Sequence, residues 1–86
     1  MRVLIPHALR SYTGQRDQVS AQGETLDDLL WDLDRKFPGM RFRMIDEQDQ
    51  IRRHVVIFVK GAKTTNLAEP LADSEEVVIV QALSGG

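Results

Sequence analysis

The chain has 86 residues, of which 42% are hydrophobic and 28% charged, and its net charge is -2. This length supports one domain with one core but not a deep substrate cavity, so an autonomous enzyme is disfavoured. The sequence contains no cysteine, which excludes disulfides, thiolate metal centres and thiol nucleophiles. Its longest apolar run, residues 55–59, is too short to span a membrane, and its charge argues against nucleic-acid binding. We expect a protein of the cytoplasm.

The N-terminal residues predict two strands. Residues 2–9 are rich in apolar side chains, and Pro6 indicates an edge position or a bulge in this strand. After the turn-forming pair Thr13-Gly14, residues 17–21 alternate around Val19. We therefore expect an antiparallel hairpin.

The central segment predicts the main helix. Apolar residues fall at the spacing of one helical stripe at Leu26, Leu29, Leu30, Leu33 and Phe37. Thr25 is placed to cap this helix, with Asp28 at the third helical position in a variant of the capping box. Pro38-Gly39 ends the element, and residues 40–45 predict a short helical turn.

The C-terminal half predicts the remaining strands. Residues 54–60 form the clearest strand and lead into a turn at Lys60-Gly61, after which residues 62–65 begin a short return. Residues 67–71 predict a loop, and residues 76–82 predict the last strand. The fold class is therefore α+β, with a mixed sheet packed on one main helix and the order β-β-α-β-β.

Both faces of the two central strands are apolar, although one helix can cover only one face of a sheet. If the helix covers Ile57, Val59, Val77 and Ile79, the other apolar set lies on the open face. That set consists of Val56, Phe58, Val78 and Val80. Contiguous exposed apolar surface marks protein interfaces, so we predict that these residues bind a partner. The alternatives are that residues 67–71 or a second copy of the chain cover this face.

Charge is distributed unevenly along the chain. A basic zone in the middle comprises Arg41, Arg43, Arg52 and Arg53. Without aromatic residues at stacking positions, we interpret this zone as ordinary surface rather than an RNA-binding face. From Thr64 onward there is no Lys or Arg, and the acidic residues are Glu69, Asp73, Glu75 and Glu76. These acids form either a solvated loop or a surface that steers the C-terminus into a basic groove on a partner.

No pattern of catalytic or metal-binding residues is visible. His7 and His54 share no short spacing and have no cysteine partners, so we expect no metal site. The glycines lack the spacing of a phosphate-binding loop, and no serine has a base placed beside it by a motif.

The chain ends in Gly85-Gly86, shortly after the last predicted strand. Glycine has no Cβ, so such a tail can enter a narrow channel and offer its carboxylate to another protein. A frayed end of no functional importance is the alternative. We predict a domain over residues 1–82 and a flexible C-terminal tail over residues 83–86.

Three further motifs occur in order along the chain: Phe58-Val59-Lys60-Gly61, Leu71-Ala72-Asp73-Ser74-Glu75-Glu76-Val77 and Ala82-Leu83-Ser84-Gly85-Gly86. Together they resemble the ubiquitin-like β-grasp sulfur-carrier family, which includes the molybdopterin-synthase small subunit and the thiamine-pathway carrier. A finer resemblance, to the branch that supplies sulfur to cysteine synthesis, rests on Ile5-Pro6, Leu9-Arg10, Thr13-Gly14 and Arg53-His54-Val55. The chain departs from the family at two turns, with Lys60 in place of the common Asn and Ser74 in place of the common Gly.

The resemblance implies a carrier rather than an enzyme. An E1-like adenylating enzyme, using its own ATP and Mg²⁺, would convert the Gly86 carboxylate into an acyl-adenylate. A persulfide or sulfide would then displace AMP and leave a thiocarboxylate on Gly86. Gly85 would give the tail its freedom, and Leu83 would anchor it on the partner. The sulfur would pass to an acceptor enzyme, either the molybdopterin-synthase large subunit or an enzyme of the cysteine synthase type.

Two other functions remain open at this point. The resemblance to ubiquitin also permits a protein modifier whose activated terminus is conjugated to lysines. A binding-only β-grasp adaptor, in which Gly85-Gly86 is incidental, is the third possibility. In each case the chain itself would bind no cofactor.

Overall fold

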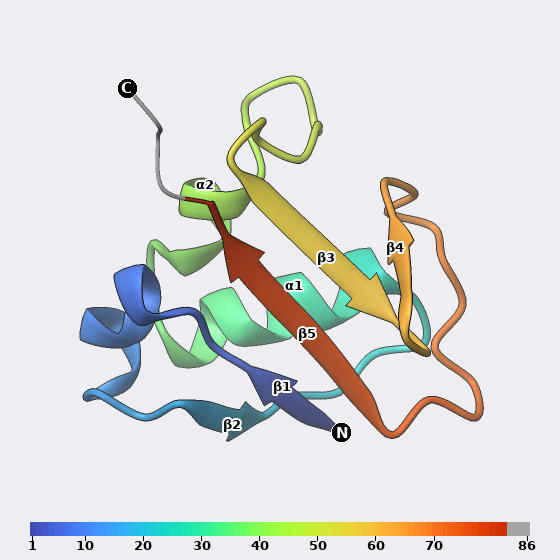
Figure 1. Ribbon diagram of the computed structural model, residues 1–86, viewed down its shortest axis with the longest axis horizontal. Coiled ribbons are helices and arrows are strands. Elements are labelled where there is room, and N and C mark those ends of the chain that lie inside the picture. Colours follow the sequence, from blue (N-terminus) through green and yellow to red (C-terminus); the bar gives the residue numbers. More distant parts are fainter. Residues whose placement is uncertain (83–86) are drawn as a thin grey trace.

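The computed structural model describes residues 1–82, so the predictions for Leu83, Gly85 and Gly86 lie outside the described residues. Five strands form one mixed sheet in the order β2-β1-β5-β3-β4, with the main helix packed on one face (Figure 1). The strands are β1 (Arg2–Leu4), β2 (Gln18–Ser20), β3 (Val55–Val59), β4 (Ala62–Thr64) and β5 (Glu76–Gln81). The central strand β5 runs parallel to β1 and antiparallel to β3. The predicted element order is confirmed, and the expected short return is β4.

The first strand is shorter than predicted. It ends at Leu4, and the 3-10 helix η1 (His7–Thr13) follows, so the prediction of one strand over residues 2–9 is wrong. Pro6 has no N–H to extend the strand pairing, and it precedes the helix rather than marking an edge or a bulge. Pairing of β1 with β2 in an antiparallel hairpin is confirmed, with Val3 opposite Val19.

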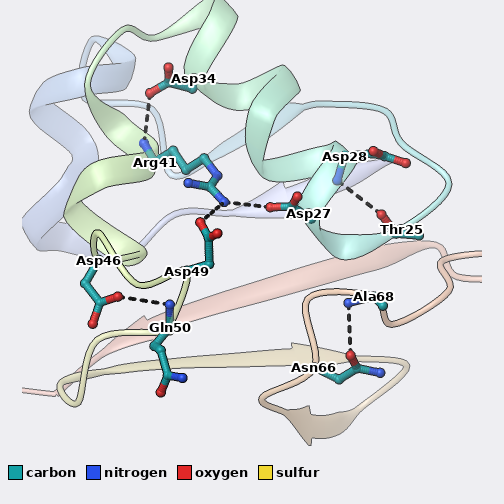
Figure 2. Close-up of polar contacts among 10 residues, drawn as sticks. All are labelled: Thr25, Asp27, Asp28, Asp34, Arg41, Asp46, Asp49, Gln50, Asn66 and Ala68. Carbon is teal, nitrogen blue, oxygen red and sulfur yellow. Dashed lines mark hydrogen bonds and ion pairs between the residues drawn. The ribbon is translucent and has the colours of Figure 1, made fainter.

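The two predicted helices are present as α1 (Leu26–Lys36) and α2 (Met40–Met44). The Asp28 N–H donates a hydrogen bond of 3.2 Å to the Thr25 side-chain oxygen, which confirms the predicted cap (Figure 2). Gly39 adopts a left-handed conformation with φ of 93° and so allows the sharp turn between the helices. Within residues 1–82, no helix has the length and apolar character needed to cross a membrane.

The core lies between α1 and one face of the sheet. Across the β3–β5 pairing, Ile57 is opposite Ile79 and Val59 is opposite Val77, and all four side chains are at most 4% exposed. They pack with the leucines of α1, which are fully buried. The sequence-based assignment of these four residues to the helix-covered face is therefore confirmed.

The loop over residues 67–71 lies on the helix side of the molecule. The N–H groups of Leu26 and Asp27, at the start of α1, donate hydrogen bonds of 2.9 Å to the carbonyls of Glu69 and Leu67. Leu71 is 2% exposed and belongs to the core. The alternative in which this loop covers the open face of the sheet is therefore wrong.

Candidate functional site

The open face of the sheet carries a continuous apolar strip. On this face, Val56 lies opposite Val80 and Phe58 lies opposite Val78, and opposed side chains in a sheet stand about 5 Å apart. The parallel pairing of β1 with β5 adds Leu4 beside Val78. We call these five residues the open-face strip. All of them are partly or largely accessible, and Val80 is 41% exposed.

The predicted grouping on the open face is therefore confirmed, whereas its role in partner binding stays a prediction. Sequence reasoning missed Leu4. Its membership depends on the pairing of β1 with β5, whose paired residues Arg2 and Glu76 are 74 positions apart. A single-sequence pattern carries no signal for that pairing.

The strip leads to the point where the chain leaves the sheet. The Ala82 N–H donates a hydrogen bond of 2.7 Å to the His54 carbonyl, which joins the end of β5 to the start of β3. Four residues follow Ala82, and four residues of extended chain span at most about 14 Å. A protein that binds residues 83–86 must therefore approach this end of the sheet.

A cleft of about 300 Å³ lies at the same end, lined by Phe42, Arg43, Arg52, His54 and Gln81. The Arg52 guanidinium carbon lies 4.6 Å from the centre of the Phe42 ring, and Arg52 Nε donates a hydrogen bond of 2.8 Å to the Phe42 carbonyl. These two contacts hold the guanidinium over the ring. We call this site the basic cleft.

Arg41 does not belong to the basic surface that we predicted. Its side chain is 9% exposed and lies with one terminal nitrogen 2.7 Å from Asp27 and 3.6 Å from Asp49, as Figure 2 shows. Its guanidinium carbon also lies 4.0 Å from the centre of the Trp31 ring. Since a buried charge requires partners, Arg41 is best explained as a link between α1, α2 and the loop that contains Asp49.

A second cavity of about 300 Å³ lies at the opposite end of β5. It is lined by Phe58, Lys60, Gly61, Asp73, Ser74, Glu75, Glu76 and Val78. Lys60 has a φ of 55°, so the position where the family commonly has Asn does require a left-handed backbone. At the second departure the left-handed residue is Asp73, with a φ of 65°, rather than Ser74.

A third cavity, of about 490 Å³, lies between the start of α1 and the loop over residues 65–68. It contains the carboxylates of Asp27 and Asp49, which already pair with Arg41. Among residues 1–82, no group of three or more His, Cys, Asp or Glu side chains is placed to hold a metal ion.

Comparison with known proteins identifies the family. The model of the ThiS family matches residues 3–86. The sulfur carrier protein CysO of Mycobacterium tuberculosis is 35% identical over 89 residues, covering 98% of this chain and 96% of the relative. The chain belongs to the ThiS family, and the predicted resemblance to sulfur carriers is confirmed.

Two solved structures support the assignment. The crystal structure of M. tuberculosis CysO matches with a TM-score of 0.87 and 33% identity, over 95% of this chain and 98% of that one. A chain of the Amycolatopsis orientalis BexX/CysO complex matches with a TM-score of 0.88 and 26% identity, over 99% and 98% of the two chains. The β-grasp fold is therefore confirmed, and the chain is similar to carriers of which one forms a complex with another protein.

Proposed function

We propose that this chain is a sulfur carrier whose Gly86 carboxylate is adenylated by a partner enzyme and then converted to a thiocarboxylate. The observation that carries the proposal is the family match, which continues through the Gly85-Gly86 end. The fold supports it, because β5 leads to that end beside an accessible apolar strip. In this proposal residues 1–82 are the recognised domain and residues 83–86 are the segment that enters the partner.

The proposed chemistry begins with a carboxylate, which is a poor electrophile. The Gly86 carboxylate attacks the α-phosphorus of ATP on the partner, and pyrophosphate leaves. Hydrosulfide then attacks the acyl carbon and expels AMP, so a thiocarboxylate replaces the carboxylate. If a persulfide attacks instead, the product is an acyl disulfide, and a thiol must reduce it to release the thiocarboxylate. The nucleotide and Mg²⁺ belong to the partner, and this chain is the substrate.

The contribution of the chain is recognition and access. Because Gly85 and Gly86 carry no side chains, they pass through a channel that would exclude bulkier residues. The open-face strip provides apolar area for docking an E1-like adenylating enzyme and, after transfer, a sulfur-acceptor enzyme. The identity to CysO proteins and the motifs at Ile5-Pro6 and Arg53-His54 make a cysteine synthase type of acceptor the first to test, ahead of the molybdopterin-synthase large subunit. The cytoplasm is the proposed compartment.

Deletion of Gly86 tests the proposal. The protein is incubated with cytosolic extract of its host, ATP and sulfide, and its intact mass is measured. We expect the wild type to gain the mass difference between one sulfur and one oxygen, and the deletion variant to gain nothing while unfolding at the same denaturant concentration. The Ser84→Ala variant is the matched control, because it changes the tail but keeps the terminal carboxylate.

Other results would support the alternatives. A deletion variant that still accepts sulfur would contradict the proposal. An unmodified wild type in an extract that modifies a known sulfur carrier would favour the adaptor. A ladder of larger adducts would favour conjugation to lysines.

A further inference from the structure

The two ends of β5 differ in charge. The cavity at its start is lined by three carboxylates, of Asp73, Glu75 and Glu76, and by one cation, Lys60. Glu76 also pairs with Arg2 at 2.8 Å, so acids still outnumber cations at this end. The basic cleft at its end is lined by Arg43 and Arg52 and by no carboxylate. A strand of this length spans about 17 Å, so the open-face strip lies between an acidic end and a basic end.

The arginines of the basic cleft are available to bind an anion. None of the ion pairs formed within residues 1–82 includes Arg43 or Arg52. Arg52 uses its Nε for the Phe42 carbonyl, which leaves its terminal NH₂ groups for another acceptor. A guanidinium matches the two oxygens of a carboxylate, and the stacking on Phe42 orients it in advance.

The cleft also offers apolar contact beside these charges. Phe42 is 56% exposed although its ring lies against Arg52. A short protein segment with a carboxylate next to an apolar side chain matches both features. A small inorganic anion would use only the arginines.

The position of the basic cleft indicates which protein supplies that segment. Gln81 lines the cleft, and the next residue, Ala82, is held to the His54 carbonyl. In any enzyme that takes up the terminal carboxylate through a channel, the mouth of that channel must therefore lie beside the basic cleft. The activating enzyme must distinguish this chain from other proteins by its folded surface, because all proteins have a terminal carboxylate.

We propose that the basic cleft docks an acidic segment at the channel mouth of the enzyme that adenylates the tail, an inference that rests on the proposed function. Because the other end of β5 is acidic, the same partner would be repelled in the reversed orientation. The charge pattern along β5 thus sets the direction in which the carrier docks, while the open-face strip supplies apolar contact.

The test uses the purified adenylating enzyme of the host and the rate of ATP–pyrophosphate exchange as a function of carrier concentration. Arg43→Glu should raise the KM for the carrier by about tenfold or more with little change in kcat, because it places a like charge against the acidic segment. Arg53→Glu is the matched control, since it changes the net charge equally at an exposed residue that does not line the cleft. We expect its KM to stay within about twofold of the wild type.

The outcomes separate this inference from the function on which it rests. If the wild type supports exchange and the two variants behave alike, the basic cleft has no role and the inference fails alone. If the wild type supports no exchange with an enzyme that is shown to be active on another sulfur carrier, the proposed function fails and the inference fails with it. A charge reversal can then confirm the pairing between the cleft and the acidic segment. Replacing an acidic residue at the enzyme's channel mouth by Arg should return the KM of Arg43→Glu toward the wild-type value.

A second measurement excludes other occupants of the cleft. The Nε–H resonances of Arg43 and Arg52 are recorded by NMR in the full chain, in a full chain with an amidated Gly86, and with added inorganic phosphate. We expect that neither amidation nor phosphate shifts these resonances. Addition of the adenylating enzyme should shift the resonances of both arginines. A shift on amidation would mean that the chain's own carboxylate occupies the cleft. Saturable binding of phosphate would identify a phosphate site, and either result would overturn the inference.

Discussion

The two faces of the sheet are built from the same kinds of side chain and yet differ in what surrounds them. On β3, Ile57 is fully buried against the helix, whereas its neighbours Val56 and Phe58 are partly accessible on the other face. The same contrast holds on β5, where Ile79 is 2% exposed and Val80 is 41% exposed. Apolar character therefore does not by itself identify the core of this protein. The position of α1 decides which face contributes to stability and which remains available for contact.

Truncation on the covered face should have the largest effect on stability. Ile57→Ala should lower the free energy of unfolding by about 2–5 kcal/mol, because it leaves a cavity under α1. Val56→Ala, the next residue on the same strand, should cost less than about 1 kcal/mol, because its side chain already meets solvent. Urea unfolding of both variants measures the difference. Equal losses would show that the open face is packed as tightly as the covered one.

Substitution on the open face should have the larger effect on binding. Val80→Ser should change the free energy of unfolding by no more than about 0.5 kcal/mol, because the residue is already well exposed. Its affinity for the adenylating enzyme should fall by about fivefold or more, as expected when a contact worth about 1 kcal/mol is lost. Calorimetric titration measures this affinity, with Ala68→Ser, at an exposed residue of the loop on the helix side, as the control. Wild-type affinity in Val80→Ser would remove Val80 from the docking surface.

The smallest expected effect is a change in the pH dependence of stability, caused by a carboxylate on the helix that covers the sheet. Asp32, on α1, accepts a hydrogen bond of 2.9 Å from the Gln22 backbone N–H and pairs with Lys36 and Arg35. The Gln22 hydrogen bond is the main cause that holds the pKa of Asp32 below its usual value of 3.8, and the two cations lower it further against the opposing effect of burial. The carboxyl group thus has a lower pKa in the folded chain than in the unfolded one.

The stabilisation from Asp32 is therefore complete above pH 3.8 and is lost as the pH falls through the lower, folded-state pKa. Asp32→Asn removes this titration but keeps an oxygen that accepts the Gln22 hydrogen bond. Unfolding between pH 2 and pH 5 should show a steeper loss of stability in the wild type than in the variant, by a small margin. Parallel curves would show that Asp32 does not couple folding to pH.

Most of the local structure could be predicted from the sequence, because the signals are local. The leucine stripe, the Thr25 cap and the end at Pro38-Gly39 predict α1 closely. The apolar runs likewise predict β3 and β5 and the alternation between their two faces. The error at β1 arose because Leu9 is apolar, as a strand residue would be. In the structure Leu9 belongs to η1 and is buried in the core from there.

The candidate site was predictable only in part. Val56, Phe58, Val78 and Val80 follow from alternation along two strands, and the structure brings them together. Leu4 joins them through a pairing between distant segments. The basic cleft unites α2, the residues before β3 and the end of β5, three segments that no local pattern connects. Arg41 was misplaced for a related reason, since its carboxylate partners lie 14 and 8 positions away in sequence.

The sequence by itself determined most of the secondary structure after residue 13, the family and the Gly85-Gly86 end, because hydrophobic period, capping and motif order act over short stretches of chain. Only the tertiary structure decided which apolar face is covered, which arginines remain accessible and what lies beside the end of β5. Those properties arise when distant segments pack together. The charge pattern on which the proposed docking direction depends is therefore a property of the folded protein.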